Sequence, residues 1–160
     1  MVSKIKLLFV DDETKFLEAT TERLRLRGLE VQAFTNGEDA LNASEKEKFD
    51  VALLDLKMPG MAGEELLKKL KDIHPFMEVV ILTGHGSISS AVDCTRCGAY
   101  EYLQKPCAID ELISVISKAY AKRIKAKEAT KATRVEELLG KAMGYSPMEL
   151  LEELKKIDME

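Results

Sequence analysis

Four short groups of polar residues stand where apolar, strand-like runs end, and their side chains could do chemistry together. The chain places three carboxylates, a hydroxyl and an ammonium there: Asp11 and Asp12 after residues 5–10, Asp55 after 49–54, Thr83 with Gly84 after 79–82, and Lys105 with Pro106 after 100–104. In an open parallel sheet the carboxyl ends of the strands line one crevice. If these runs are parallel strands of one sheet, the five charged and hydroxyl side chains share a pocket.

The carboxylates predict a site for a hard divalent cation. Asp11, Asp12 and Asp55 would repel one another, and Mg²⁺ relieves such repulsion while keeping water and phosphate oxygens as its other ligands. The ammonium of Lys105 could hold a phosphoryl oxygen or pair with Asp55. The Thr83 hydroxyl could donate to another phosphoryl oxygen.

Asp55 is the candidate nucleophile of this pocket. A carboxylate beside Mg²⁺ and a lysine suits phosphoryl transfer, because that reaction mainly needs positioning and charge neutralisation. Gly84 would leave the backbone open to close approach by a ligand. Each of these residues alone could be a solvated acid, a helix cap or a loop residue, but their shared place at strand ends favours a site.

Alternating strand-like and helix-like segments would position these residues. The expected strands are Lys4–Val10, Glu30–Phe34, Phe49–Leu54, Glu78–Leu82 and Ala99–Gln104. Helices are expected to stop at Gly28 and Gly98, which suit a left-handed C-terminal position, and one is expected to begin at a capping box of Thr35 and Glu38. Strict alternation predicts an α/β fold, a doubly wound five-stranded parallel sheet with helices on both faces.

Composition narrows the class of protein. The 160 residues carry a net charge of −4, with 46% hydrophobic and 32% charged residues, which is typical of a globular chain without overall attraction to nucleic acid or an anionic membrane. No apolar stretch reaches the roughly 20 residues of a spanning helix, and the N-terminus lacks a signal-peptide profile, so we expect a cytoplasmic protein. Cys94 and Cys97 form a CxxC, but their helical spacing favours small buried side chains over a redox pair or a zinc site.

Taken together, the motifs resemble those of the receiver domain of two-component response regulators, over about Lys4 to Lys122. The matching segments are Leu8-Phe9-Val10-Asp11-Asp12-Glu13, Leu53-Leu54-Asp55-Leu56-Lys57-Met58-Pro59-Gly60-Met61, Ile81-Leu82-Thr83-Gly84-His85-Gly86 and Gly98-Ala99-Tyr100-Glu101-Tyr102-Leu103-Gln104-Lys105-Pro106. The resemblance implies a flavodoxin-like strand order, 2-1-3-4-5. It also implies that the chain is a signalling module.

The resemblance assigns the phosphoryl acceptor and the metal ligands. Asp55 would accept a phosphoryl group from the phosphohistidine of a sensor histidine kinase or a phosphotransfer protein. Mg²⁺ would be bound directly by Asp12 and Asp55, through water by Asp11, and by the carbonyl of Lys57. The module would be no enzyme beyond its own phosphorylation and dephosphorylation.

A switch is implied by the same resemblance. Thr83 and Lys105 would contact the phosphoryl group, as would the backbone of Lys57 and Gly84. Thr83 would be drawn inward, and the Tyr102 ring would then leave an exposed rotamer. The surface of the fourth helix, fifth strand and fifth helix would change for a downstream protein or for self-association.

Some positions depart from common receiver patterns. His85, two residues after Thr83, could tune the lifetime of phosphoryl-aspartate or could be a solvent-facing loop residue. The Lys57 side chain could act likewise. Cys107 and Ala108 replace the Phe-Asp often found after Lys-Pro, so the fifth helix loses a usual side-chain cap.

The last part of the chain predicts a helical extension. We expect a receiver over 1–124 and a helical hairpin over 125–160, a receiver standing alone with a short appendage. Ser146 and Glu149 form a capping box with Pro147 at the first helical position. Apolar stripes lie on both sides of it: Val135, Leu138, Leu139, Ala142 and Met143, then Leu150, Leu151, Leu154 and Ile157. They could dock on the receiver, a second subunit or a partner helix.

Two other functions compete. The hairpin could be a DNA-binding helix pair, and residues 118–134 hold seven basic residues and one acidic one. However, Glu149, Glu152 and Glu153 would repel phosphate where a recognition helix approaches DNA, so we expect DNA binding to be unlikely and residues 118–134 to be a solvated helix face. The chain could also be a phosphohydrolase with an aspartyl-phosphate intermediate, but such enzymes usually carry a second acid where this chain has Lys57. The complete pocket speaks against a receiver that only binds partners.

Overall fold

The computed structural model describes residues 4–84 and 86–160 and contains one parallel sheet. Its strands are β1 (Lys6–Val10), β2 (Glu30–Phe34), β3 (Val51–Leu54), β4 (Glu78–Thr83) and β5 (Glu101–Gln104). They pair in the order β2-β1-β3-β4-β5, all parallel, as the resemblance implied. The doubly wound α/β fold is therefore confirmed.

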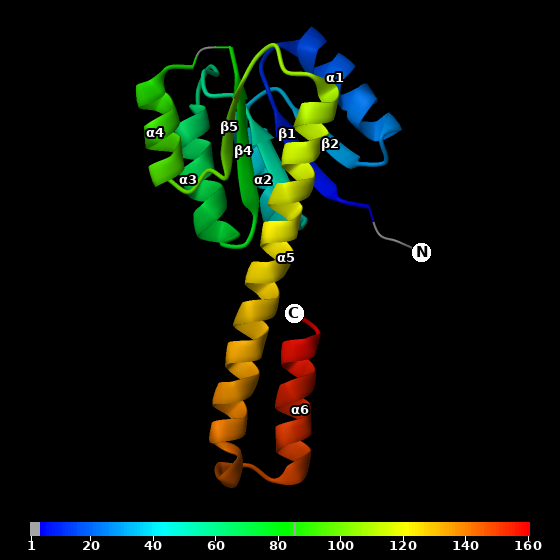
Figure 1. Ribbon diagram of the computed structural model, residues 1–160, viewed down its shortest axis with the longest axis vertical. Coiled ribbons are helices and arrows are strands. Elements are labelled where there is room, and N and C mark those ends of the chain that lie inside the picture. The colour runs from blue at the N-terminus through cyan, green and yellow to red at the C-terminus, as the bar shows by residue number, and fades with distance from the viewer. Residues whose placement is uncertain (1–3, 85) are drawn as a thin grey trace. The chain divides into compact units, whose positions relative to one another are not determined.

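Six α-helices and a short 3₁₀ segment complete the described chain. They are α1 (Thr14–Leu26), α2 (Gly37–Lys46), α3 (Gly63–Ile73), α4 (Ile88–Arg96), α5 (Ile109–Gly140), η1 (Ala142–Gly144) and α6 (Pro147–Asp158). In the receiver, α1 and the first part of α5 cover one face of the sheet, and α2, α3 and α4 cover the other (Figure 1).

The alternation of side chains along each strand explains the two layers of core. Leu7, Phe9, Val51, Leu53, Val80 and Leu82 pack with residues of α1 and α5, whereas Leu8, Val10, Ala52, Leu54, Val79 and Ile81 pack with residues of α2, α3 and α4. Successive residues of a strand point to opposite faces, and here both faces are covered. β3 is therefore apolar at every position, and β1 and β4 carry polar residues only at their ends.

Several local expectations hold and one is wrong. Gly28 and Gly98 end their helices with φ of 92° and 102°, the left-handed conformation that glycine adopts without strain. The start of α2, however, is not capped by Thr35. The side chain of Asn36 accepts a hydrogen bond from the Asp39 N–H at 2.9 Å, so the helix begins one residue later than the capping-box pattern indicated.

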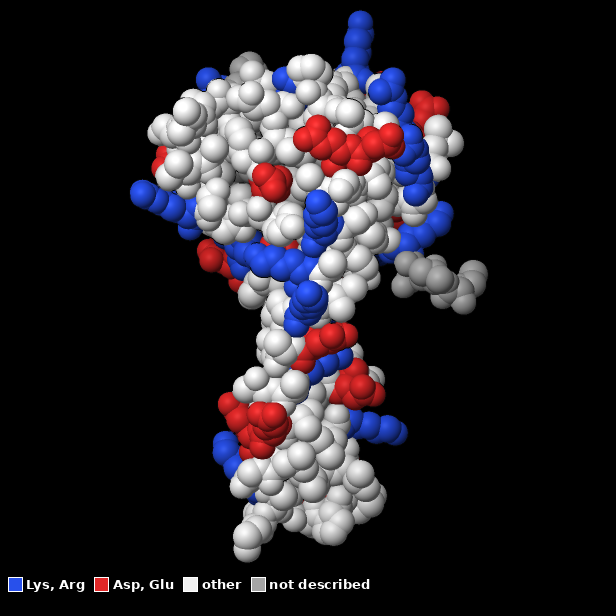
Figure 2. Space-filling model, viewed as in Figure 1, with Lys and Arg blue, Asp and Glu red and all other residues white. Residues whose placement is uncertain are grey.

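The described chain divides into two compact units, Met1–Arg123 and Ile124–Glu160. Within the second unit, Ser146 and Glu149 form the expected capping box and Pro147 stands at the first helical position. Ile157 is the one buried residue of this unit among those described. Residues 142–148 carry no charge, and the corresponding end of the unit is white in Figure 2.

The predicted apolar stripe before the turn is only partly packed. Val135 and Leu138 are half-buried, but Leu139 and Met143 are exposed, because a pair of helices has no third element to cover their outer side. The hairpin therefore leaves apolar side chains in solvent.

The basic stretch is not simply a solvated face. Lys127 and Lys131 donate to the carbonyls of Glu160 and Asp158, at 3.0 and 3.1 Å, and Arg134 forms an ion pair with Glu160. Cations at a helix C-terminus stabilise its unpaired carbonyls. Part of the basic charge thus holds the end of α6.

Candidate functional site

The strand ends bring the predicted site residues to one edge of the sheet. At this edge, Val10 of β1 lies opposite Leu54 of β3, and Thr83 of β4 lies opposite Gln104 of β5. The ladder continues for one step beyond the strands, since the Asp55 N–H donates to Val10 O and the Lys105 N–H to Thr83 O, both at 3.0 Å. Asp55 and Lys105 are therefore fixed by backbone hydrogen bonds.

Three carboxylates meet at this edge. Asp11, Asp12 and Asp55 each offer an oxygen such that the three atoms lie within 4.8 Å of one another. Asp11 and Asp55 are buried, with 0% and 1% of their surface exposed, whereas Asp12 is exposed. A strand-end position suggests a solvent-exposed carboxylate, but the Asp55 carboxylate is buried.

The two oxygens of Asp55 have different surroundings. Oδ1 accepts a hydrogen bond from the Leu56 N–H at 2.9 Å. Oδ2 is buried and has no hydrogen-bond partner among residues 4–84 and 86–160. A buried carboxylate oxygen without a donor is costly, and a bound cation would satisfy it.

Lys105 pairs with Asp11 and not with Asp55. Its Nζ lies 2.6 Å from Asp11 Oδ2 and 3.1 Å from Glu13 Oε1, and 4.2 Å from the centre of the Phe16 ring. Glu13 and Phe16 were not among the expected site residues. Glu13 follows directly after the two aspartates, so its place in the acidic triplet was the available signal.

The pKa values of this ion pair reflect burial and charge. Burial raises the pKa of Asp11, and the hydrogen bonds from Lys105 and from the Glu13 N–H oppose this only in part. Burial also lowers the pKa of Lys105, but the hydrogen bond to Asp11, its charge and those of the other carboxylates outweigh this, so that the pKa is raised. The lysine thus stays charged beside the carboxylates.

The loop after β3 is held close to Asp55 by Gly63. A Cβ added to Gly63 would lie 2.1 Å from the Asp55 carbonyl oxygen, and the Gly63 N–H donates to Leu56 O at 2.8 Å. Only glycine allows this approach of two backbones. The side chain of Lys57 is exposed within this loop.

On the other side of the pocket, Thr83 is buried at the end of β4. Gly84 is exposed, and a Cβ added to it would approach the Lys105 side chain to 4.0 Å. The two residues therefore lie on the lysine side of the acidic cluster. His85, a candidate for tuning, lies outside the described residues.

Tyr102 is not in the exposed position from which the switch was expected to start. The residue is half-buried and packs against the core on the side of α3 and α4, and its hydroxyl is buried. A Cβ added to Gly86 would lie 2.1 Å from this hydroxyl oxygen, so the backbone of residue 86 passes over the ring end. Burial raises the pKa of the phenol, and the nearby Ser87 backbone opposes this to a smaller extent.

The cysteines supply no chemistry to the site. All three are free; Cys94 is buried and Cys97 is half-buried, so only part of the expected pair is covered. Burial raises the pKa of the Cys94 thiol to about 11, which keeps it protonated and unreactive at neutral pH.

The donor set fits a hard divalent cation. Carboxylate oxygens are the preferred ligands of Mg²⁺, and two of these three carboxylates are buried, where their repulsion is least screened. The unpartnered oxygen of Asp55 is a further ligand position. The acidic cluster can therefore hold a metal.

Comparison with known proteins defines the class. The family model for the response regulator receiver domain matches residues 7–117. The chain belongs to the response regulator receiver family of two-component systems. No helix among the described residues is long and apolar enough to cross a membrane.

Solved structures of receivers share the fold. A CheY-like receiver domain protein from Methanospirillum hungatei is 33% identical, with a TM-score of 0.75, over 78% of this chain and 99% of that one. NtrX from Brucella abortus, solved in complex with ADP, is 30% identical with a TM-score of 0.76, over 81% of this chain and 30% of that one.

Curated relatives are longer regulators. The DNA-binding transcriptional regulator NtrC of Escherichia coli is 38% identical over 110 residues, which are 69% of this chain and 24% of NtrC. The C4-dicarboxylate transport transcriptional regulatory protein DctD of Rhizobium meliloti is 32% identical over 117 residues, 73% of this chain and 25% of DctD. The chain thus spans about a quarter of the length of these relatives, and the similarity lies in the receiver.

Proposed function

We propose that the protein is a phosphorylation-dependent receiver that accepts a phosphoryl group on Asp55 from the phosphohistidine of a histidine kinase or a phosphotransfer protein. The observation that carries the proposal is the buried Asp55 carboxylate, which lies with those of Asp11 and Asp12 in one cluster within 4.8 Å. The ammonium of Lys105, held at the same edge, supports it.

Mg²⁺ is the proposed cofactor. Asp12 and Asp55 would bind it directly, Asp11 through water, and the Lys57 carbonyl would complete the protein ligands. When bound, the ion neutralises the charge of the carboxylates and of the incoming phosphoryl oxygens. The buried Oδ2 of Asp55, which has no donor among the described residues, supports this assignment.

Asp55 would act as the nucleophile through Oδ2. The Leu56 N–H holds Oδ1 at 2.9 Å and so fixes the plane of the carboxylate. As the new O–P bond forms, the P–N bond to the donor histidine breaks, and its electron pair returns to the imidazole nitrogen. The reaction needs mainly positioning and charge neutralisation, which backbone hydrogen bonds at both Asp55 and Lys105 favour.

Lys105 and Thr83 would hold the transferred group. The Lys105 ammonium, which pairs with Asp11 and Glu13 in the structure, would donate one of its hydrogen bonds to a phosphoryl oxygen. Thr83 would donate its hydroxyl, and the backbone at Lys57 and Gly84 would contact the remaining oxygens. Because Gly84 is exposed and lies beside the Lys105 side chain, nothing on residue 84 blocks such an approach.

The signal would leave through Tyr102 and the surface of α4, β5 and α5. Movement of Thr83 toward the phosphoryl group would stabilise the inward Tyr102 ring, and phosphorylation would thus shift the population between two packings. The half-buried ring beneath Gly86 supports an inward position as one of the two. Ile88 and Val92 expose apolar surface on α4, which suits a protein partner or self-association.

The competing functions have less support. We expect no turnover of external phosphate esters, since Lys57 stands where phosphohydrolases of this kind carry a second acid. DNA binding appears in the names of longer relatives, but the matched part is the receiver. Basic and acidic residues are interspersed on the face seen in Figure 2. Glu149, Glu152 and Glu153 lie within the first seven residues of α6.

Labelling by a small phosphodonor tests the proposal. Acetyl phosphate with Mg²⁺ should add one phosphoryl group to the intact chain, and the label should be absent without Mg²⁺ or in Asp55→Asn. Asp72→Asn, an exposed aspartate on α3, is the matched control and should label normally. Labelling of Asp55→Asn to the wild-type level would refute the acceptor, and steady hydrolysis of p-nitrophenyl phosphate would favour the phosphohydrolase.

A further inference from the structure

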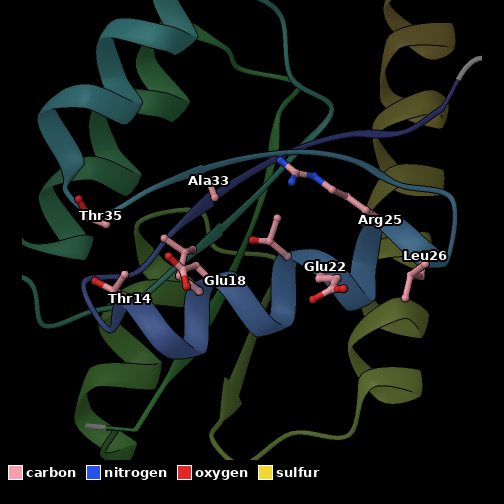
Figure 3. A pocket seen from close by; sticks show the side chains of 9 residues that line it. Thr14, Glu18, Glu22, Arg25, Leu26, Ala33 and Thr35 are labelled. Atoms are coloured by element: carbon pink, nitrogen blue, oxygen red, sulfur yellow. The ribbon is translucent and has the colours of Figure 1, made fainter.

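A groove runs between α1 and the edge strand β2, away from the acidic cluster. Its volume is about 630 Å³, and it is lined by one face of α1, by Ala33 of β2 and by Thr35 just after β2. In Figure 3, Ala33 on the strand lies across from Glu18 on the helix, and Arg25 extends from the helix toward the strand. Helix α1 therefore leaves part of the outer strand uncovered.

The backbone of β2 is unpaired along this groove. In a parallel ladder, alternate residues turn both their N–H and their C=O to the same neighbouring strand. The Glu30 N–H donates to Ile5 O and Phe34 O accepts from the Asp11 N–H, so the even-numbered residues of β2 bond to β1. Val31 and Ala33 must then turn their groups to the open edge, because β2 is the last strand of the sheet.

Only one of these edge groups is covered by a side chain. Arg25 Nη2 donates to Val31 O at 2.8 Å, which closes the lower part of the edge. Ala33 has no such cover among the described residues, and its side chain is exposed. The edge is thus open at Ala33, the residue that also lines the groove.

The groove offers polar groups that have no partner. Thr21 is 4% exposed, and its hydroxyl oxygen has no hydrogen-bond partner among residues 4–84 and 86–160. Glu18 and Glu22 stand one turn apart on α1 and form no ion pair within the described chain, while the nearby Arg25 is engaged with the strand. A buried hydroxyl without a partner points to a missing ligand, and the two exposed carboxylates beside it give the groove a negative charge that suits a basic one.

We propose that this groove binds an extended segment of a partner protein, which adds to β2 as a sixth strand and places alternating apolar and basic side chains against α1. The backbone of the segment would bond to the N–H and C=O of Ala33. An apolar side chain would cover Ala33, and a lysine or arginine two residues away would reach Glu18 or Glu22. Strand addition of this kind takes its affinity from main-chain hydrogen bonds and its specificity from alternate side chains.

Charge decides between this occupant and others. The carboxylates at Glu18 and Glu22 repel phosphate, which disfavours nucleic acid and anionic lipid. A partner helix would leave the edge groups of Ala33 without hydrogen bonds, at a cost that an extended chain avoids. Leu26, which is 80% exposed at the end of the groove, extends the apolar surface available to the segment.

A displayed library of unconstrained nine-residue peptides tests the proposal on the full chain. The expected selection is for sequences in which lysine or arginine alternates with an apolar residue at a spacing of two. Synthetic peptides from the selection should protect the Ala33 N–H from hydrogen exchange. Enrichment of helical patterns, with apolar residues three and four apart, would overturn strand addition, as would the absence of any enrichment.

Variants separate the two contributions to binding. Ala33→Pro removes the outward N–H without removing a hydrogen bond to β1, and it should weaken binding at least tenfold, as should N-methylation of the peptide at the pairing residue. Glu18→Gln with Glu22→Gln should weaken basic peptides at least tenfold, whereas Glu45→Gln on α2 should not. Unchanged affinity in the Glu18→Gln, Glu22→Gln double variant would contradict the proposal even if Ala33→Pro failed to fold. A dimer of the chain formed through the same edge, detected by analytical ultracentrifugation, would also contradict it.

Discussion

The receiver and the C-terminal hairpin differ in how their residues are held. At the receiver edge, Asp11 and Asp55 are buried, and groups far apart in sequence meet through the sheet. In the hairpin, contacts join neighbouring parts of two helices, and Ile157 is its one buried residue among those described. Contacts between distant parts of the chain are therefore concentrated where charge must be positioned, whereas the hairpin depends on caps and ion pairs at its ends.

The largest difference should appear when a leucine is truncated in each region. Leu54→Ala, directly before Asp55, removes a fully buried side chain and should lower the free energy of unfolding by about 2–5 kcal/mol. Leu151→Ala, on the outer side of α6, should change it by less than about 0.5 kcal/mol. Urea denaturation measures both, and equal losses would show that the outer side of the hairpin is packed in solution.

A glycine in each region gives a second contrast. Gly63→Ala should cost about 3 kcal/mol, because the new Cβ would meet the Asp55 carbonyl at 2.1 Å and displace the loop after β3. Gly140→Ala, which meets nothing within 4 Å, should be neutral or stabilise α5 by up to about 1 kcal/mol. Thermal denaturation distinguishes them, and a neutral Gly63→Ala would mean that this backbone approach is not needed.

Magnesium should act on the receiver alone. At ten times its measured Kd, Mg²⁺ should stabilise the wild type by about 1.4 kcal/mol, as binding to the native state alone requires. The increase should disappear in Asp12→Asn, which removes the exposed ligand of the cluster. Calorimetry with Mg²⁺ and with K⁺ at equal ionic strength provides the test, and stabilisation that survives in Asp12→Asn would place the ion elsewhere.

The smallest expected effect is a loss of stability at the start of α6 at low pH. Hydrogen bonds with the Ser146 backbone and side chain lower the pKa of Glu149 below its ordinary 4.5. A carboxyl whose pKa is lowered in the folded state stabilises it above the ordinary pKa and loses this as pH falls through the folded value. The protection of amides in the first turn of α6, measured as the exchange rate relative to that of an unstructured peptide at the same pH, should therefore fall below pH about 4.5, and Glu149→Gln should abolish that dependence. Protection factors that stay constant through this range would contradict the cap.

Much of the fold, the grouping of the site residues and one helix cap could be predicted from the sequence. Apolar runs alternating with helical stripes predicted the sheet, and the rule that strand ends share one edge brought Asp11, Asp55, Thr83 and Lys105 together. The cap at Ser146 was also found, since its partners are three residues apart. Periodicity and local spacing carry such information.

Contacts that depend on side-chain packing could not be read in this way. The sequence suggested that Lys105 could pair with Asp55, whereas in the structure it pairs with Asp11 and Glu13. The burial of Asp55 and the inward Tyr102 ring depend on how close the loops at Gly63 and Gly86 approach. The exposure of Leu139 and Met143 depends on the absence of a third helix in the described unit.

The position of the phosphoryl group is the most direct test of the proposed function. After labelling by acetyl phosphate with Mg²⁺, borohydride reduction converts a phosphorylated aspartate to homoserine, and peptide sequencing by mass spectrometry locates it. We predict homoserine at position 55 and at no other aspartate. Homoserine at Asp11 or Asp12, or an unchanged residue at 55 in a chain that carries label, would contradict the assignment of Asp55 as the acceptor.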